Sequence, residues 1–208
     1  MAEKNKQKTP SVLKGSCLWG ILLFAILVLI DQLTKAAAEI LLAGGKEYPL
    51  VGNLIGLRLT FNTGIAYGIG GDASPKLKIG VIVGTGVIML ALTIAYFLLD
   101  KRRSWLRTAF VFIVAGGVGN LIDRVYYKVW SSTTMGVRDM VDLSRFGFAV
   151  CNFAVFFISA GAVMLVLAFL FFDTDAIFPQ GKYKQLQKEA EEKSEEKESE
   201  KGEKKVNG

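Results

Sequence analysis

The stretch FGFAVCNFAVFFISAGAVMLVLAFLFF, from Phe146 to Phe172, contains no charged residue. A second run, from Ile79 to Leu99, is likewise uncharged. Each run exceeds the roughly 20 apolar residues that an α-helix needs to cross about 30 Å of hydrocarbon. Both therefore predict membrane-spanning helices.

Two further apolar runs reach spanning length only when polar residues at their ends are included. The four predicted spans cover roughly residues 15–38, 78–99, 106–123 and 148–172. The chain is 51% hydrophobic and only 21% charged, with a mean hydropathy of +0.38. Soluble domains are usually less apolar. The expected fold class is an all-α membrane protein with four transmembrane helices.

Lysine and arginine beside the span ends predict the orientation. They precede the first span (Lys4, Lys6, Lys8, Lys14), separate the second from the third (Lys101, Arg102, Arg103, Arg107) and follow the fourth (Lys182, Lys184, Lys188). We expect these groups and both termini on the cytoplasmic side. The segments 43–76 and 124–147 then face out, although they also carry some positive charge.

Composition divides the chain into three parts. Residues 1–14 form a basic cytoplasmic N-terminus, and residues 15–172 form the transmembrane domain. Within that domain, short apolar runs broken by glycine predict a small outer β element, a cradle at about 43–72. Residues 173–208 are rich in Lys and Glu and too poor in apolar residues to form a core. They are predicted to be a disordered or loosely helical cytoplasmic tail, with a helix that docks on a partner as the alternative.

The residue types present exclude several kinds of chemistry. The chain has no histidine, which excludes His-based catalysis and His-ligated zinc. Its two cysteines, Cys17 and Cys151, are expected toward opposite faces of the membrane, which argues against a disulfide or a Cys-based metal site. No metal and no cofactor are therefore predicted. The first span lacks a small-residue cleavage site, so it is expected to remain uncleaved.

Polar residues stand at the ends of the apolar runs. Asp31 and Asp123 each close one run, Asp142 lies just before the last, and Asn152 lies inside it. Ionisable or amide groups at membrane depth are costly without partners, so they are functional candidates. Simpler roles also fit. Asn120, three residues before Asp123 on one helix face, could hold helices together.

Five short motifs occur in order along the chain. They are D-Q-x-T-K at 31–35, F-N-x-G-x-A-Y-G at 61–68, G-N-x-x-D-R at 119–124, V-D at 141–142 and N-x-A at 152–154. This series resembles the lipoprotein signal peptidase family, signal peptidase II. Taken alone, Asn62 and Gly64 could be ordinary turn residues. The resemblance covers about residues 15–172.

The resemblance implies an aspartic endopeptidase of the bacterial inner membrane that works without a cofactor. Such enzymes remove signal peptides from prolipoproteins, cleaving before a diacylglyceryl-modified cysteine. The implied partners are these substrates and membrane lipid, with no nucleic acid. Two aspartates at the outer face share a water molecule, and Asp142 matches the first of them. The supporting and substrate-binding positions that match are Asp31, Lys35, Asn62, Gly64, Asn120, Asp123, Arg124 and Asn152.

The second catalytic aspartate of the family would fall at position 155, which is valine here. Valine neither donates nor accepts a proton. Three hypotheses follow. The chain is an impaired variant of a true peptidase, an inactive pseudoenzyme that binds lipidated peptides, or an enzyme in which Asp139 or Asp123 substitutes for the missing carboxylate.

A small transporter or scaffold is the rival from another class. It would place polar groups along several helices through the membrane midplane. Here the polar groups concentrate near the outer span ends, which favours a site at the outer interface.

Overall fold

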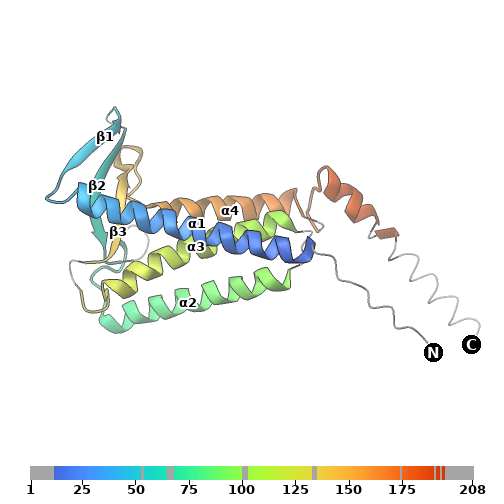
Figure 1. The fold of residues 1–208 in the computed structure, drawn as a ribbon, viewed down its shortest axis with the longest axis horizontal. Coiled ribbons are helices and arrows are strands. Elements are labelled where there is room, and N and C mark those ends of the chain that lie inside the picture. Colours follow the sequence, from blue (N-terminus) through green and yellow to red (C-terminus); the bar gives the residue numbers. More distant parts are fainter. Residues whose placement is uncertain are drawn as a thin grey trace, which may run out of the picture.

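The computed structural model of the chain describes residues 12–52, 54–64, 68–99, 103–132, 135–173, 175–189, 191–192 and 194. Four helices, α1 (Val12–Leu41), α2 (Pro75–Leu98), α3 (Ser104–Tyr126) and α4 (Phe153–Leu170), run along one another to form an elongated bundle (Figure 1). All four are long and apolar enough to cross a membrane. The predicted four-helix membrane fold is confirmed.

Helix α3 is the central member of the bundle, packing against α1, α2 and α4. Its contact with α4 is the closest because glycines remove side chains from the interface. A Cβ atom at Gly116 would lie 2.4 Å from the Ala154 carbonyl oxygen, and one at Gly161 would lie 2.8 Å from the Ala109 oxygen. Backbone therefore touches backbone between these two helices.

Helix α4 begins at Phe153, later than the predicted span that starts at 148. The Asn152 side chain accepts a hydrogen bond of 3.0 Å from Val155 N and so caps the helix. The preceding residue, Cys151, pairs instead as an isolated β-bridge with Val141. The first residues of this uncharged run thus belong to the sheet region rather than to the helix.

A small antiparallel sheet covers one end of the bundle (Figure 1). Its order is β1 (Glu47–Val51), β2 (Ile55–Asn62) and β3 (Val137–Asp142). The first two strands lie in the predicted cradle at 43–72. The third comes from the second outer segment, which carried no strand prediction, and a short 3-10 helix η2 (Ser144–Phe146) follows it.

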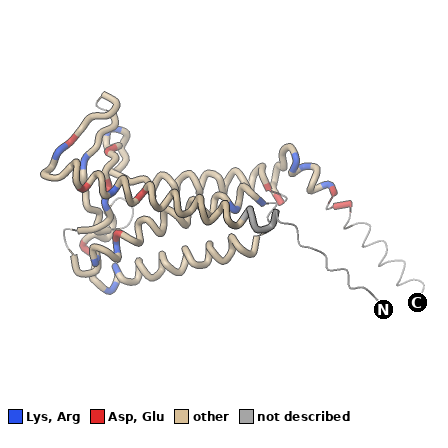
Figure 2. Tube along the Cα trace, viewed as in Figure 1, with Lys and Arg blue, Asp and Glu red and all other residues tan. Residues whose placement is uncertain are grey.

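The sheet is attached to the bundle by an apolar cluster. Ala38 of α1, Leu42 directly after that helix and Met140 of β3 are buried together. Leu57, Leu59, Val141 and Phe153 pack around them. In Figure 2 charged residues gather at the two ends of the bundle, and the middle stretches of the helices are almost free of them.

Part of the predicted cytoplasmic tail is helical. Residues 182–189 are helical. They lie at the bundle end opposite the sheet (Figure 1). The rest of the predicted tail beyond residue 194 lies outside the described residues, as does most of the predicted N-terminal part, 1–14.

Candidate functional site

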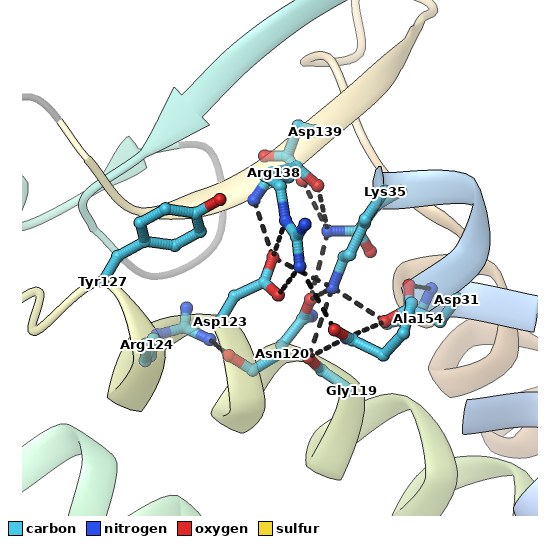
Figure 3. Close-up of polar contacts among 12 residues, drawn as sticks. Asp31, Lys35, Gly119, Asn120, Asp123, Arg124, Tyr127, Arg138, Asp139 and Ala154 are labelled. Carbon is cyan, nitrogen blue, oxygen red and sulfur yellow. Dashed lines mark hydrogen bonds and ion pairs between the residues drawn. The ribbon is translucent and has the colours of Figure 1, made fainter. Parts of the chain in front are cut away.

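Buried charged side chains cluster where the sheet meets the helices (Figure 3). Asp31 and Lys35 lie one turn apart on α1 and form an ion pair of 2.8 Å in which both side chains are fully buried. Asp31 Oδ1 also accepts a hydrogen bond of 2.9 Å from Ala154 N, in the first turn of α4. A carboxylate at a helix N-terminus is favourable because the helix dipole is positive there.

Lys35 connects α1 to α3. Its Nζ donates to Asn120 Oδ1 at 3.0 Å and to the Gly119 carbonyl oxygen at 3.3 Å, and it lies 3.5 Å from Asp123 Oδ2. A Cβ atom at Gly119 would lie 2.4 Å from Asp31 Oδ2, so this close approach requires glycine. The cation is thus surrounded by acceptors, as burial of a charge demands.

Asp123 binds Arg138 of β3. Its Oδ1 accepts from Arg138 Nη2 at 2.8 Å, and its Oδ2 accepts from Arg138 N at 2.9 Å and Nε at 3.3 Å. Asp123 is fully buried, and Arg138 is nearly so. Both oxygens of this carboxylate are occupied by cationic or backbone donors, which ties α3 firmly to the sheet.

An outer layer surrounds Arg138. Its Nη1 donates to Glu39 Oε2 at 3.1 Å, its Nη2 to Gln32 Oε1 at 3.1 Å, and its guanidinium lies 5.5 Å from the centre of the Tyr127 ring. The Tyr127 hydroxyl donates to both Glu39 oxygens at 2.9 Å. Burial, together with this bond, raises the pKa of Tyr127 to about 12.

The amide of Asn152 leads from this network to Asp139. Its Nδ2 donates to Asp139 Oδ1 at 2.6 Å, to Asn120 Oδ1 at 3.1 Å and to the Arg138 carbonyl oxygen at 3.3 Å. Its Oδ1 caps α4 at Val155 N. Asn152 therefore links the Asp139 carboxylate to the helix turn that carries position 155.

Asp139 differs electrostatically from the other acidic groups of the site. It is 4% exposed. Burial raises its pKa to about 6, against the opposing effects of hydrogen bonds from Asn62 and Asn152 and of the charges on Lys35 and Arg124. No salt bridge to Asp139 within 4.0 Å occurs among the described residues, in contrast to Asp31 and Asp123. Asp139 is thus a buried carboxylate whose pKa is raised well above its ordinary value.

Asp142 lies elsewhere. It ends β3, where its Oδ2 lies 2.7 Å from Arg58 Nε of β2, and its side chain is 21% exposed. A hydrogen bond of 2.9 Å from Ser144 N contributes most to lowering its pKa, and Arg58 lowers it further. Among the described residues, Asn152 of the buried network links Asp139, not Asp142, to the helix turn that carries Val155. Asp142 pairs with Arg58 instead.

The remaining predicted residues hold the loop after β2. Asn62 Oδ1 accepts a hydrogen bond of 2.9 Å from Gly64 N. Arg124 Nη2 donates to the Gly64 carbonyl oxygen at 3.0 Å and so ties this loop to α3. Most of the predicted supporting residues therefore lie in one connected region between the helices and the sheet: Asp31, Lys35, Asn62, Asn120, Asp123, Arg124 and Asn152.

Sequence reasoning missed three members of the network. Arg138, Glu39 and Tyr127 belong to none of the five motifs and are not predicted site residues. Glu39 did carry a signal, since it lies one helical turn after Lys35 and two turns after Asp31, on the same face of α1. The sequence predicts a role for Asp139 only as a substitute for the missing aspartate.

Comparison with known proteins places this arrangement in a family. A family model described as "Signal peptidase (SPase) II" matches residues 23–171. The lipoprotein signal peptidase of Fusobacterium nucleatum is 31% identical over 165 residues, covering 78% of this chain and 93% of that protein. That of Treponema denticola is 33% identical over 130 residues, covering 61% of this chain and 70% of that protein.

Solved structures agree. A bacterial membrane enzyme determined by the in meso method at 1.9 Å resolution is 26% identical, with a TM-score of 0.60, over 73% of this chain and 92% of that one. A second such enzyme, at 2.3 Å resolution, is 25% identical with a TM-score of 0.59, over 72% of this chain and 85% of that one.

Proposed function

The chain belongs to the signal peptidase II family, proteases that remove signal peptides from prolipoproteins, and we propose that its working carboxylate is Asp139. It is a multi-pass membrane protein. The observation that carries the proposal is the state of Asp139, which is buried, free of a direct cationic partner among the described residues, and has a pKa of about 6. A general base works best when its pKa lies near the working pH.

The other acidic groups suit this role less well. Asp123 is held by three donors of Arg138, so taking up a proton would disrupt a buried ion pair. Asp142 has a lowered pKa and is turned toward Arg58. We assign Asp123 and Asp31 to holding the helices in place, and we treat the sequence-based choice of Asp142 as the competing hypothesis.

In the proposed reaction, ionised Asp139 takes a proton from a water molecule as the water oxygen bonds to the scissile carbonyl carbon. The tetrahedral intermediate then collapses, the C–N bond breaks, and the amide nitrogen leaves with a proton returned from Asp139. In relatives with a second aspartate, that group polarises the carbonyl. Here position 155 is Val155, in the first turn of α4 and 39% exposed.

Because position 155 carries valine instead of aspartate, we expect this chain to cleave its substrate slowly. When catalytic groups act as a unit, removing one of them abolishes most of the rate enhancement. The same residue also favours a second function, in which the chain binds lipidated peptides without cleaving them. The cradle and the buried network needed for binding have their polar side chains in place.

We place the site at the outer face of the bacterial inner membrane with both termini in the cytoplasm, and we take the substrates to be diacylglyceryl-modified prolipoproteins. The Lys and Arg pattern supports this orientation. A cysteine label at Gly71 is expected to react from outside intact cells, and one at Ser194 only after the membrane is opened. Labelling at position 194 from outside intact cells would contradict the proposed cytoplasmic location of the C-terminus.

The test is cleavage of a diacylglyceryl-modified prolipoprotein by the purified full chain, followed on a gel. Val155→Asp is expected to raise the rate by orders of magnitude, because it restores a proton-sharing pair. In that background Asp139→Asn is expected to abolish the gain. The matched change Asp142→Asn should cost far less, since it removes a surface contact with Arg58.

Three results would contradict parts of this scheme. If Asp142→Asn abolishes the gain and Asp139→Asn does not, the competing choice of Asp142 is correct. If Val155→Asp leaves the rate unchanged, position 155 is not the second catalytic position. If the unaltered chain already cleaves as fast as the Val155→Asp variant, the impairment hypothesis is wrong.

A further inference from the structure

The segment after α4 turns back onto the bundle end that lies away from the sheet. The backbone N–H groups of Ile177, Phe178 and Gln180 donate to the carbonyl oxygens of Phe169, Leu170 and Phe171, at 3.1, 2.8 and 3.0 Å. Phe169 and Leu170 are the last residues of α4 and Phe171 is its C-cap, so these carbonyls have no partner within the helix. The hydrogen bonds fix the segment against the end of α4. This region lies beyond residue 171, where the match to the family model ends.

Side chains fix the same segment to the start of α3. Asp173 is 2% exposed and lies 3.3 Å from Arg103 Nε, and Arg103 also pairs with Asp175. Tyr183 is 3% exposed, with its hydroxyl 3.4 Å from Ser104 Oγ. Residue 173 and residues 175–183 therefore have a defined orientation on the bundle.

This orientation presents apolar and basic groups together. Ile177 is 67% exposed and Phe178 is 61% exposed. Lys182, Lys184 and Lys188 follow, all exposed. Between residues 176 and 188 the sequence contains these three lysines and no acidic residue, whereas Lys and Glu are mixed after residue 188.

Two tryptophans belong to the same end of the bundle. Trp19, near the start of α1, is 67% exposed, and Trp105, in the first turn of α3, is 37% exposed and stacks on Phe172. Exposed tryptophans near the ends of spanning helices are typical of the membrane–water boundary. Ile177 and Phe178 are hydrogen-bonded to the last residues of α4, which puts them at the same end of the bundle as these tryptophans.

We propose that residues 177–188 form a binding surface for anionic phospholipid, with Ile177 and Phe178 inserted at the boundary of headgroups and acyl chains and the three lysines bound to headgroup phosphates. Exposed apolar side chains beside lysines are the composition of interfacial lipid-binding segments. Juxtamembrane lysines are attracted to anionic lipids. The lipid fits this surface better than a protein partner does because the surface is hydrogen-bonded to the end of a spanning helix, beside exposed tryptophans.

The insertion is tested on the full chain with a spin label at Phe178→Cys, in a background with Cys17→Ser and Cys151→Ser. The protein is reconstituted in vesicles of phosphatidylcholine alone or with one quarter phosphatidylglycerol. We expect the label to be more accessible to oxygen than to a water-soluble nickel chelate, and more so with phosphatidylglycerol. A label equally open to the chelate in both vesicles overturns the insertion, and label–label broadening indicates contact between two copies of this chain instead.

The charge contribution is tested by lipid enrichment in mixed nanodiscs, measured by native mass spectrometry. Each lysine near an anionic surface accounts for about a fivefold change in binding. Substituting Lys182, Lys184 and Lys188 together by Gln is expected to lower phosphatidylglycerol enrichment at least about fivefold. The matched control substitutes Lys197, Lys201 and Lys204 by Gln and removes the same charge elsewhere. Equal losses in both variants, or none in either, overturn the proposal. Neither experiment requires peptidase activity.

Discussion

Asp31 of α1 accepts a hydrogen bond of 2.9 Å from the backbone nitrogen of Ala154, so a carboxylate from the first helix binds the N-terminus of the last. The same carboxylate pairs with Lys35 at 2.8 Å, and Lys35 in turn reaches Asn120 of α3. One acid and one base thus join three helices below the sheet. Since both are fully buried, the stability of this junction depends on their remaining paired.

Replacing Lys35 by Met is therefore expected to destabilise the protein strongly. The change leaves Asp31 without its cation and removes one of the two cations beside Asp123. Removing one partner of a buried ion pair typically costs about 3–5 kcal/mol. Thermal unfolding of the purified chain in detergent should reveal a large drop in Tm.

The control is the double substitution Asp31→Asn with Lys35→Met. With both charges gone, no unpaired carboxylate remains at position 31, and the loss should be smaller than for Lys35→Met alone. A double variant that is less stable than the single one would mean that Asp31 contributes mainly by capping α4.

The second prediction concerns the effect of Gly119→Ala on stability. Because a Cβ atom there would meet Asp31 Oδ2 at 2.4 Å, Gly119→Ala should push α1 and α3 apart and lower stability by about 1–3 kcal/mol. Gly84→Ala in α2 is the matched control, since a Cβ atom there meets nothing within 4 Å. It should be neutral or stabilising by up to about 1 kcal/mol, as alanine favours a helix over glycine. Similar losses for both would refute the close contact.

The third prediction concerns pH. The pKa of Asp139 is raised from 3.8 to about 6 in the folded chain. Between these values the folded state binds a proton that the unfolded state has lost, so this group lowers stability as pH rises from about 4 to about 6. Asp139→Asn should remove that decline and raise stability at pH 7, by up to about 3 kcal/mol at the upper limit. Unfolding at pH 4, 5, 6 and 7 measures the difference between the two proteins.

For Asp142 the pH dependence of stability is expected to have the opposite sign from that for Asp139, because its pKa is lowered. Its lowered pKa means that its contacts with Ser144 and Arg58 stabilise the fold above the unfolded pKa and are lost as pH falls through the folded value. Asp142→Asn should therefore lower stability at pH 7. If Asp142→Asn and Asp139→Asn change the pH dependence in the same direction, the environments assigned to these two carboxylates are wrong.

The spans could be predicted from sequence because hydrocarbon imposes one simple requirement, a long apolar run. Residues of separate motifs also meet in space: Lys35 of α1 and Asn152, which caps α4, both bind Asn120 of α3. Spacing along the sequence predicts which side chains share a face where they belong to a helix, because the helix fixes their directions.

Strand β3 could not be predicted in the same way. Its sequence, VRDMVD, contains three charged residues and no clean alternation, because Arg138 and Asp139 are both buried by polar partners rather than by apolar packing. The family resemblance assigns the first catalytic aspartate to Asp142, but the strand brings Asp139 into the buried network and leaves Asp142 beside Arg58. Three residues along a strand place Asp139 and Asp142 in different environments, one beneath the sheet and one at its edge with Arg58.

The last prediction separates binding from turnover. A diacylglyceryl-modified peptide that spans the cleavage site should bind both the unaltered chain and the Val155→Asp variant, because Asn62, Arg124 and the sheet that frame the site are the same in both. At a free concentration one hundred times Kd, binding should raise the free energy of unfolding by about 2.7 kcal/mol, detected as a rise in Tm. The same peptide without its lipid is the control and should give a much smaller shift. A rise in Tm for the Val155→Asp variant alone would mean that the second carboxylate is needed for binding. No rise in either protein would exclude the hypothesis that this chain binds lipidated peptides without cleaving them.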